Sequence, residues 1–479
     1  MINPDFFQRY PVAPSFTADV DLNIVNFGAV GDGKHINTSA IQKAIDTCSG
    51  KGGGKVTVPK GEFLTGTISM KSNVHLHLEE GGMILGSPYM KDYSKVYWSH
   101  DVNHENGAQC LVSASGQSKM MISGLGSING NARVDSTGEF RDTGNNDLRP
   151  PLFWFENCTD VTVKEVTFRQ SLMWTVMFDN CKHVWVDRIK IVENYFYNAD
   201  GVDIIDCEDF LIENCDINTD DDGICLKSAS RGCNRVVARN NKVRSLCNAF
   251  KMGTTSSGSF TNILIENNHV WQTVISGIAL QIVDGGVMDN VVIKNMVMDG
   301  VGTPINLRLG DRGKPGKMKV QRGILRNVQI SGITATTGKV MKYNEAEQHH
   351  HPYPPYPSSI CGLPGYLIEN VSIEDVTITI VEGFPTGTSE ELLREVSESP
   401  AKYPENRMFG DLPAYGFYFR HARGIQLKNI SVSTPKEDGR PAFVFDDVHN
   451  ATCSGLTGNN AKDTSLLSVK SGCSKIRIG

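Results

Sequence analysis

One short phrase recurs along this chain of 479 residues, and it reads LIENCDI (211–217), VARNNKV (237–243), LIENNHV (264–270), VIKNMVM (292–298), ILRNVQI (324–330), LIENVSI (367–373) and QLKNISV (426–432). The central asparagines of the first four copies follow one another at nearly constant steps in the upper twenties. The later copies are spaced more widely, which indicates the same unit with loops inserted. A period in the twenties with alternating apolar residues is typical of leucine-rich repeats or of β-solenoids.

The residue types within the repeat decide between these two folds. Because the phrase L-x-x-L-x-L is absent and β-branched residues dominate, we predict an all-β fold, a right-handed single-stranded parallel β-helix. About 10–12 coils would stack with adjacent strands roughly 4.8 Å apart. Apolar residues at helical spacing predict one amphipathic helix at 38–48. We expect an N-terminal extension (1–22) and a single domain (23–479), with loop insertions near 311–322, 341–364 and 384–415.

Composition excludes several classes of function. Lys and Arg number 47 against 53 Asp and Glu, a net charge of −6, and no basic block stands out, so nucleic acid is not an expected partner. The longest apolar runs fall well short of the roughly 18 residues that a membrane-spanning helix needs, so no membrane span is expected. The N-terminal residues lack a basic region followed by an apolar one, so we expect a cytoplasmic protein or one whose signal has been removed. A solenoid with capped ends needs no partner, and we expect a monomer.

Twelve cysteines raise the question of disulfides or a metal site. No pair has the C-x-x-C spacing of zinc sites, and five share one column of the repeat, which favours stacked, buried thiols that behave as small apolar residues. These five are Cys158, Cys181, Cys207, Cys233 and Cys473. The repeated asparagines are interpreted likewise, as side-chain amides that bond along the stack at a turn. We assign neither ladder any chemistry.

Carboxylates gather where two successive coils each begin a strand. Aligning ADGVDII with DDGICLK places Asp200 in the same column as Asp222, with Asp221 beside them and Asp220 adding a fourth acid. Like charges within a few ångströms raise pKa values and cost stability, so folding alone does not select such a cluster. We therefore interpret it as a candidate catalytic centre, whereas the structural alternative is a solvated acidic turn.

The same alignment extends through NAFKMG, SGIALQ and TPINLRL and sorts residues into columns. One column is expected to point inward: Ile204, Leu226, Met252, Leu280 and Leu307. Two flanking columns are expected to face solvent: Asp203, Cys225, Lys251, Ala279 and Asn306, and Ile205, Lys227, Gly253, Gln281 and Arg308.

Two mechanisms use such a cluster of acids. In an inverting glycoside hydrolase, one carboxylic acid protonates the glycosidic oxygen while another carboxylate activates a water molecule on the opposite face of the sugar. In a polysaccharide lyase, the acids would hold Ca²⁺ and a Lys or Arg would abstract a proton next to a uronate carboxylate.

Two stretches carry a resemblance to a known family. Residues 23–66, which begin NIVNFGAVGDG, resemble the N-terminal cap and first coil of pectinolytic β-helix proteins, lyases and hydrolases alike. NADG (198–201), followed by DDGICLKS (221–228), resembles the N-T-D and D-D motifs of the polygalacturonases, glycoside hydrolase family 28. The resemblance runs from about residue 22 to the end. It implies that Asp221 is the general acid and that Asp200 and Asp222 orient and activate water, with inversion.

The chain departs from the family pattern at two motifs. The family's G-H-G falls at Cys247–Ala249, so Asn248 replaces its histidine, and its R-I-K falls at Ala279–Gln281, so both cations for a uronate carboxylate are missing. We predict that basic residues of neighbouring coils take over at shifted subsites, which favours a branched or rhamnose-containing pectin over plain homogalacturonan. The candidate substrate-binding residues are Asn248, Lys251, Lys227, Arg308, Gln281 and Asp203.

The predicted function is a glycoside hydrolase that cleaves α-linked galacturonic acid or a related linkage in pectic polysaccharides or oligosaccharides, with no cofactor and no metal. The insertions follow the motif-bearing coils and would wall one end of a cleft, which favours exo-action. Two alternatives stay open: a Ca²⁺-dependent pectic lyase, and a non-catalytic glycan-binding β-helix. Glycan degradation favours secretion or the periplasm, while the visible N-terminus leaves a cytoplasmic location open.

Overall fold

The structure is a computed structural model that describes residues 14–16, 20–96, 108–132, 150–192, 196, 198–313, 322–337, 356–381, 395–435, 437–460 and 464–479. The described chain divides into two compact units, which we call the N-terminal unit (up to Ile224) and the C-terminal unit (from Cys225). The single domain expected from the sequence stays a prediction. Much of the three predicted loop insertions falls outside the described residues, at 314–321, 341–355 and 384–394.

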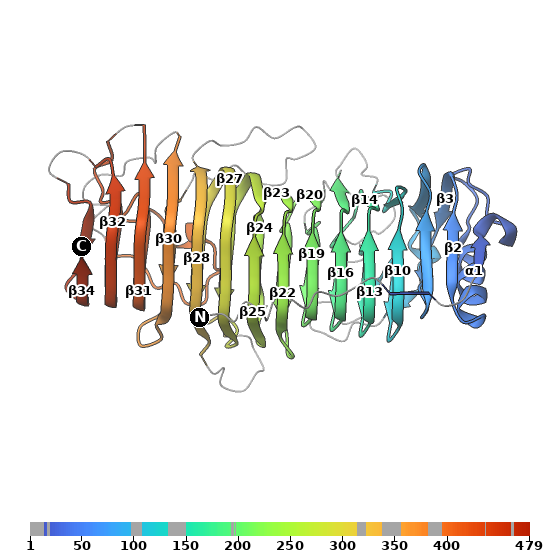
Figure 1. Ribbon diagram of the computed structural model, residues 1–479, viewed down its shortest axis with the longest axis horizontal. Helices are drawn as coiled ribbons and strands as arrows, with labels where there is room; N and C mark the ends of the chain where they lie inside the picture. The colour runs from blue at the N-terminus through green and yellow to red at the C-terminus, as the bar shows by residue number, and fades with distance from the viewer. Residues whose placement is uncertain are drawn as a thin grey trace. The chain divides into compact units, whose positions relative to one another are not determined.

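The N-terminal unit is a parallel β-helix built from three ladders of short strands (Figure 1). The first ladder joins β1 (Asp21–Asn23), β2 (Gly54–Val58), β5 (Val74–Leu78), β10 (Ser118–Ser123), β13 (Thr159–Lys164), β16 (Lys182–Asp187) and β19 (Glu208–Glu213). The second joins β3 (Gly61–Thr65), β6 (Gly82–Gly86), β11 (Ser127–Asn129), β14 (Thr167–Arg169), β17 (Lys190–Val192) and β20 (Asp216–Thr219). The third joins β4 (Ile68–Ser69), β9 (Val112–Ser115), β12 (Phe153–Glu156), β15 (Val176–Asp179) and β18 (Val202–Ile205).

Helix is scarce in the described residues, as predicted. The amphipathic helix α1 (Thr38–Gly50) buries Ile41, Ala44, Ile45 and Cys48 at helical spacing. The described part of the N-terminal unit also contains two short 3₁₀ turns, η2 (Ile24–Phe27) and η3 (Met90–Asp92), and an antiparallel pair, β7 (Lys95–Val96) with β8 (Ala108–Gln109).

The C-terminal unit repeats the parallel pairing with longer strands that turn from one face of the coil to the next (Figure 1). Its strands are β22 (Cys233–Arg239), β23 (Lys242–Ser245), β24 (Asn248–Ser256), β25 (Ser259–Glu266), β26 (His269–Ile282), β27 (Val287–Leu309), β28 (Ile324–Thr337), β29 (Ser358–Cys361), β30 (Ile368–Ile380), β31 (Phe417–Ser433), β32 (Phe443–Gly458), β33 (Leu467–Val469) and β34 (Ser474–Ile478). The unit boundary falls in β21 (Ile224–Ser228), and a 3₁₀ turn, η6 (Asn406–Phe409), precedes β31.

The asparagine ladder is present, and the cysteine ladder is present at Cys158, Cys181 and Cys207. Cys473, also predicted to belong to it, is half-buried and lies beside Val448 instead of a cysteine. The repeated asparagines adopt left-handed backbone angles near +55°, and the Asn295 amide donates to Oδ1 of Asn267 at 3.1 Å. The cysteines described are free thiols and nearly all are buried. Burial raises the pKa of the Cys181 thiol well above its ordinary value, and its backbone N–H donates to Sγ of Cys207 at 3.3 Å. Uncharged, stacked thiols pack as small apolar groups.

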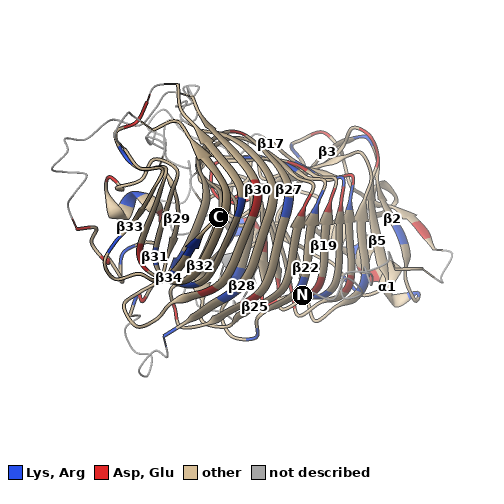
Figure 2. Cartoon of the chain, turned by 60° about the vertical axis from the view of Figure 1, so that its left-hand side comes forward, with Lys and Arg blue, Asp and Glu red and all other residues tan. Residues whose placement is uncertain are grey.

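Charge is dispersed over the molecule. Figure 2 shows Lys and Arg interspersed with Asp and Glu along the strands. Among the described residues, no helix combines the length and the apolar character needed to cross a bilayer.

Candidate active site

Two aspartates of the N-terminal unit each stand two positions before a strand. The Gly201 N–H donates to the backbone carbonyl of Asp222 at 2.8 Å, and the Val202 N–H donates to that of Gly223 at 2.9 Å. In the parallel ladders of this protein, a backbone N–H donates to the carbonyl of the residue just before its register partner; Val176, for example, pairs with Val202 and donates to Gly201. The partner of Gly201 is therefore Gly223, and Asp200 lies opposite Asp222. This register agrees with the predicted column. Both residues are 3% exposed, so the two acids are largely removed from solvent.

Asp221 is more exposed than the buried acids Asp200 and Asp222. Its Oδ1 accepts the backbone N–H of Asp222 at 2.8 Å, and its Oδ2 accepts the Asn198 amide at 3.3 Å. The Thr219 hydroxyl donates to its carbonyl oxygen at 2.7 Å. Local donors on both sides therefore fix the orientation of a carboxylate that solvent reaches. One accessible acid beside two buried acids is an arrangement in which a general acid and a general base have different environments.

Asp203 lies deeper than the sequence predicts. It pairs in register with Met177, which pairs with Trp154, and it is fully buried. Trp154, Met177 and Ile205 belong to one apolar cluster. The expectation that Asp203 and Ile205 face solvent is therefore wrong: both are buried, and Ile205 packs with large apolar side chains of the adjoining coils.

The predicted columns continue in register through the C-terminal unit. Lys251 pairs with Ala279, which pairs with Asn306, and Gln281 pairs with Arg308. The inward column is buried as predicted, with exposed fractions of 2% or less for Ile204, Leu226, Met252, Leu280 and Leu307.

All members of the flanking columns except Lys227 are buried as well, which corrects the prediction that they face solvent. Residues 395–412, which we call the covering segment, contact Lys251, Gln281, Asn306 and Arg308 of these columns. The carbonyl oxygen of Pro404 accepts the Gln281 amide at 2.9 Å and the Asn306 amide at 3.2 Å. The segment packs through Val396, Phe409 and Leu412 onto strand residues. In the C-terminal unit the buried members of the two columns are Cys225, Lys251, Gly253, Ala279, Asn306, Gln281 and Arg308.

Arg308 holds the covering segment in place. The side chain is 1% exposed and donates to the carbonyl oxygens of Glu398 at 2.6 Å and of Gly362 at 3.0 Å. Its guanidinium also lies 5.2 Å from the centre of the Phe409 ring. Burial lowers the pKa of the Arg308 guanidinium below its ordinary value. Arg308 and Gln281 thus lie buried against the covering segment, and their contact with substrate stays a prediction.

The remaining candidates differ in exposure. Asn248 is fully buried and its amide lies 3.2 Å from Sγ of Cys247. Lys251 is 4% exposed, and its ammonium group donates to the hydroxyl of Tyr403, itself 50% exposed, at 3.1 Å. Lys227 is partly exposed. A ligand on this side of the C-terminal unit meets Tyr403 before Lys251.

Residues 48–344, more than half of the chain, match the family model described as glycosyl hydrolases family 28. The chain belongs to glycosyl hydrolases family 28. The acids at Asp200, Asp221 and Asp222 lie within the matched region.

Two relatives of this family 28 chain carry different functional names. It is 27% identical over 305 residues to an exo-poly-alpha-D-galacturonosidase of Dickeya chrysanthemi, a match that covers 52% of this chain and 50% of that protein. It is 31% identical over 183 residues to the plasmin and fibronectin-binding protein A of Streptococcus pneumoniae, covering 36% of this chain and 24% of that protein. The chain thus spans half or less of these two curated relatives.

A solved structure shows the same fold. The hyperthermoactive exopolygalacturonase of Thermotoga maritima superposes on this family 28 chain with a TM-score of 0.65 at 23% identity, covering 79% of this chain and 92% of that one. This likeness confirms the parallel β-helix fold.

Two features of the family 28 chain were missed by sequence reasoning. Asn198 stands in the quoted NADG motif, yet its role as a donor to Asp221 requires the geometry of the turn. The covering segment is an insertion whose position is set by contacts with residues far away along the chain, for which a repeat pattern carries no signal.

Proposed function

We propose that this chain is a glycoside hydrolase that cleaves α-linked galacturonic acid or a related linkage in pectic glycans. The observation that carries the proposal is the pairing of Asp200 with Asp222 across two coils, with the more exposed Asp221 held beside them. Membership of family 28 supports the same chemistry.

In the proposed reaction Asp221 gives its proton to the glycosidic oxygen. The bond between that oxygen and the anomeric carbon breaks, and water attacks the anomeric carbon from the opposite face. The base formed by Asp200 and Asp222 takes a proton from this water, and the product has inverted configuration. The two buried acids and the solvent-reached acid supply the different environments that these roles need.

Substrate recognition is proposed to involve Lys227, Asn248 and Lys251, which keep their candidate roles from the sequence. Exo-action is proposed because relatives that cleave from chain ends share this fold and because the chain carries long insertions. We also propose a secreted or periplasmic location, where pectic glycans are found, and a monomeric state.

Incubation with polygalacturonate and with rhamnose-containing pectin fragments tests the proposal. If the chain is a hydrolase, new reducing ends should form at a rate that a chelator does not change. If it acts from chain ends, short products should be released from the start of the reaction. Unsaturated products that disappear with chelator would indicate a lyase. Absence of product from every glycan would favour a binding role, as for the plasmin and fibronectin-binding protein A among the relatives.

A further inference from the structure

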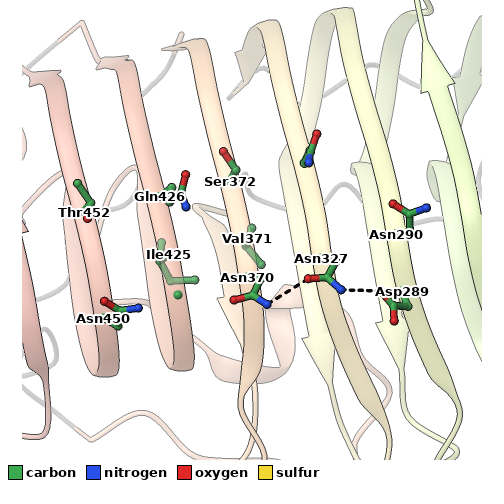
Figure 3. A pocket seen from close by; sticks show the side chains of 12 residues that line it. Asp289, Asn290, Asn327, Asn370, Val371, Ser372, Ile425, Gln426, Asn450 and Thr452 are labelled. Carbon is green, nitrogen blue, oxygen red and sulfur yellow. Dashed lines mark hydrogen bonds between the residues drawn. The ribbon is translucent and has the colours of Figure 1, made fainter. Parts of the chain in front are cut away.

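A polar groove crosses five strands of the C-terminal unit, away from the covering segment (Figure 3). It runs over β27, β28, β30, β31 and β32 and has a volume of about 840 Å³. On β31 the groove is lined by Gly424–Gln426. Tyr418 and Arg420, near the other end of that strand, pair in register with the next members of the flanking columns. On β27 it uses Asp289 and Asn290, and Arg308 lies near the far end. The groove is therefore on a different face of the coil from the candidate substrate columns.

The floor of the groove carries one uncharged polar side chain per coil. Gln329 pairs with Ser372, Ser372 with Gln426 and Gln426 with Thr452, so the four lie in one row. Neighbouring parallel strands place such groups at a spacing of about 4.8 Å. Among the described residues, neither the Gln329 nor the Gln426 amide hydrogen-bonds another side chain, and both are exposed. Their donors and acceptors are available to a ligand.

The rim of the groove is fixed in advance by a chain of amides. The Asn370 amide donates to Oδ1 of Asn327 at 3.1 Å, and the Asn327 amide donates to Oδ1 of Asp289 at 2.7 Å (Figure 3). Both asparagines are held in left-handed turns. A ligand therefore meets oriented groups whose conformational entropy has already been lost on folding.

The charge of the groove selects the class of ligand. Among the described residues that line the groove, Asp289 alone is ionisable, and an ion pair of 2.7 Å with Arg326 neutralises it. This described lining offers no Lys or Arg for a carboxylate or phosphate and no aromatic ring for stacking. A polyanion would gain nothing here, while hydroxyl groups match amides and hydroxyls as both donors and acceptors.

We propose that this groove binds a neutral, hydroxyl-rich glycan strand laid across the strands, separately from the carboxylate site. Each sugar would exchange hydrogen bonds with the side chains of one or two coils. Because individual exposed hydrogen bonds contribute little and no ring stacks on the sugar, binding depends on several coils acting together, and affinity should rise with glycan length. The proposal does not rest on hydrolysis by Asp221.

Affinity electrophoresis of the full chain with Asp221→Asn tests the proposal, using gels that contain neutral galactan. We expect galactan to retard this protein, and the added pair Gln329→Ala and Gln426→Ala to weaken the retardation at least threefold. The matched control, Thr334→Ala with Thr377→Ala, changes exposed residues on the next face of β28 and β30 and should keep full retardation. In the otherwise unaltered chain, the Gln329→Ala and Gln426→Ala pair should leave hydrolysis of short pectic fragments within twofold.

Three outcomes would overturn the groove proposal: no retardation by galactan, equal retardation of both double variants, or retardation by polygalacturonate that depends on Gln329 and Gln426. Loss of pectic hydrolysis in the Asp221→Asn chain bears on the proposed function alone. As a second probe of the groove, Ser372→Arg would fill it and introduce a cation, and it should abolish retardation by galactan.

Discussion

The side-chain amide of Asn198 donates a hydrogen bond to Oδ2 of Asp221 at 3.3 Å. The two residues come from successive coils of the N-terminal unit, and Asn198 occupies a left-handed turn with φ of +60°. The amide thus links the turn before Asp200 to the acid that we propose as proton donor.

Asn198→Gly should lower kcat about tenfold and leave the fold intact. Glycine accepts positive φ without strain, so the substitution removes the amide and adds no backbone cost. Loss of one hydrogen bond of about 1.4 kcal/mol in the transition state corresponds to this factor. Steady-state kinetics on pectic fragments measure the change. A fall in thermal stability that matches the loss of activity would contradict a positioning role.

Asp221→Asn should lower kcat by roughly 10²–10⁴, the usual contribution of general acid catalysis. Asp222→Asn should be similarly severe, because it removes part of the proposed base. The matched control is Asp216→Asn, an exposed acid in the same unit, which should retain activity. Equal activity of Asp221→Asn and Asp216→Asn would remove the proposed acid from the mechanism.

Arg308→Lys should destabilise the C-terminal unit by about 3 kcal/mol. A lysine cannot reach the carbonyls of Glu398 and Gly362 together, so at least one buried acceptor loses its partner. Urea unfolding measures the effect, and limited proteolysis should show earlier cleavage in the covering segment. Arg326→Lys, at an exposed ion pair, should change stability by less than about 1 kcal/mol. If Arg308→Lys instead raised KM without destabilising the protein, the original assignment to substrate would be correct.

The attachment of the covering segment should weaken as pH rises. Burial by itself lowers the pKa of His421, but hydrogen bonds to Glu398 at 2.9 Å and to Asp447 at 2.6 Å raise it above 6.5. Since the folded-state pKa is raised, this contribution to stability is complete below pH 6.5 and is lost as pH increases through the folded-state pKa.

Urea midpoints measured across this range test the pH dependence. The difference between the unaltered chain and His421→Gln should shrink with rising pH, and Glu398→Gln should reduce the pH dependence by removing one carboxylate partner. Nearby charges that share the site are Arg420, Asp446 and His449. A difference that grows from pH 6 to pH 9 would have the wrong sign for this account.

The fold and the acid pair could be predicted from the sequence because both depend on local regularity. Coils of nearly constant length with strict alternation fix which residues stack, and Lys251, Ala279 and Asn306 pair as the alignment required. The same regularity placed Asp200 opposite Asp222, which the backbone hydrogen bonds confirm.

Exposure could not be predicted in the same way. Polar residues in a flanking column look like a solvent-facing surface, but Gln281 and Arg308 are buried by a segment that lies much further along the chain. Repeat analysis has no means of placing such an insertion. The groove could not be predicted either. The repeated asparagines had already been explained by the turns, and Gln329 and Gln426 form a row only when the coils are stacked.

Product mass spectrometry in heavy-oxygen water tests whether the Asp221 centre catalyses hydrolysis. With pectic oligosaccharides as substrate, we predict one heavy oxygen at each new reducing end, loss of this label with Asp221→Asn, and no effect of chelator. Unlabelled, unsaturated products, or labelled products formed equally by Asp221→Asn, would contradict it.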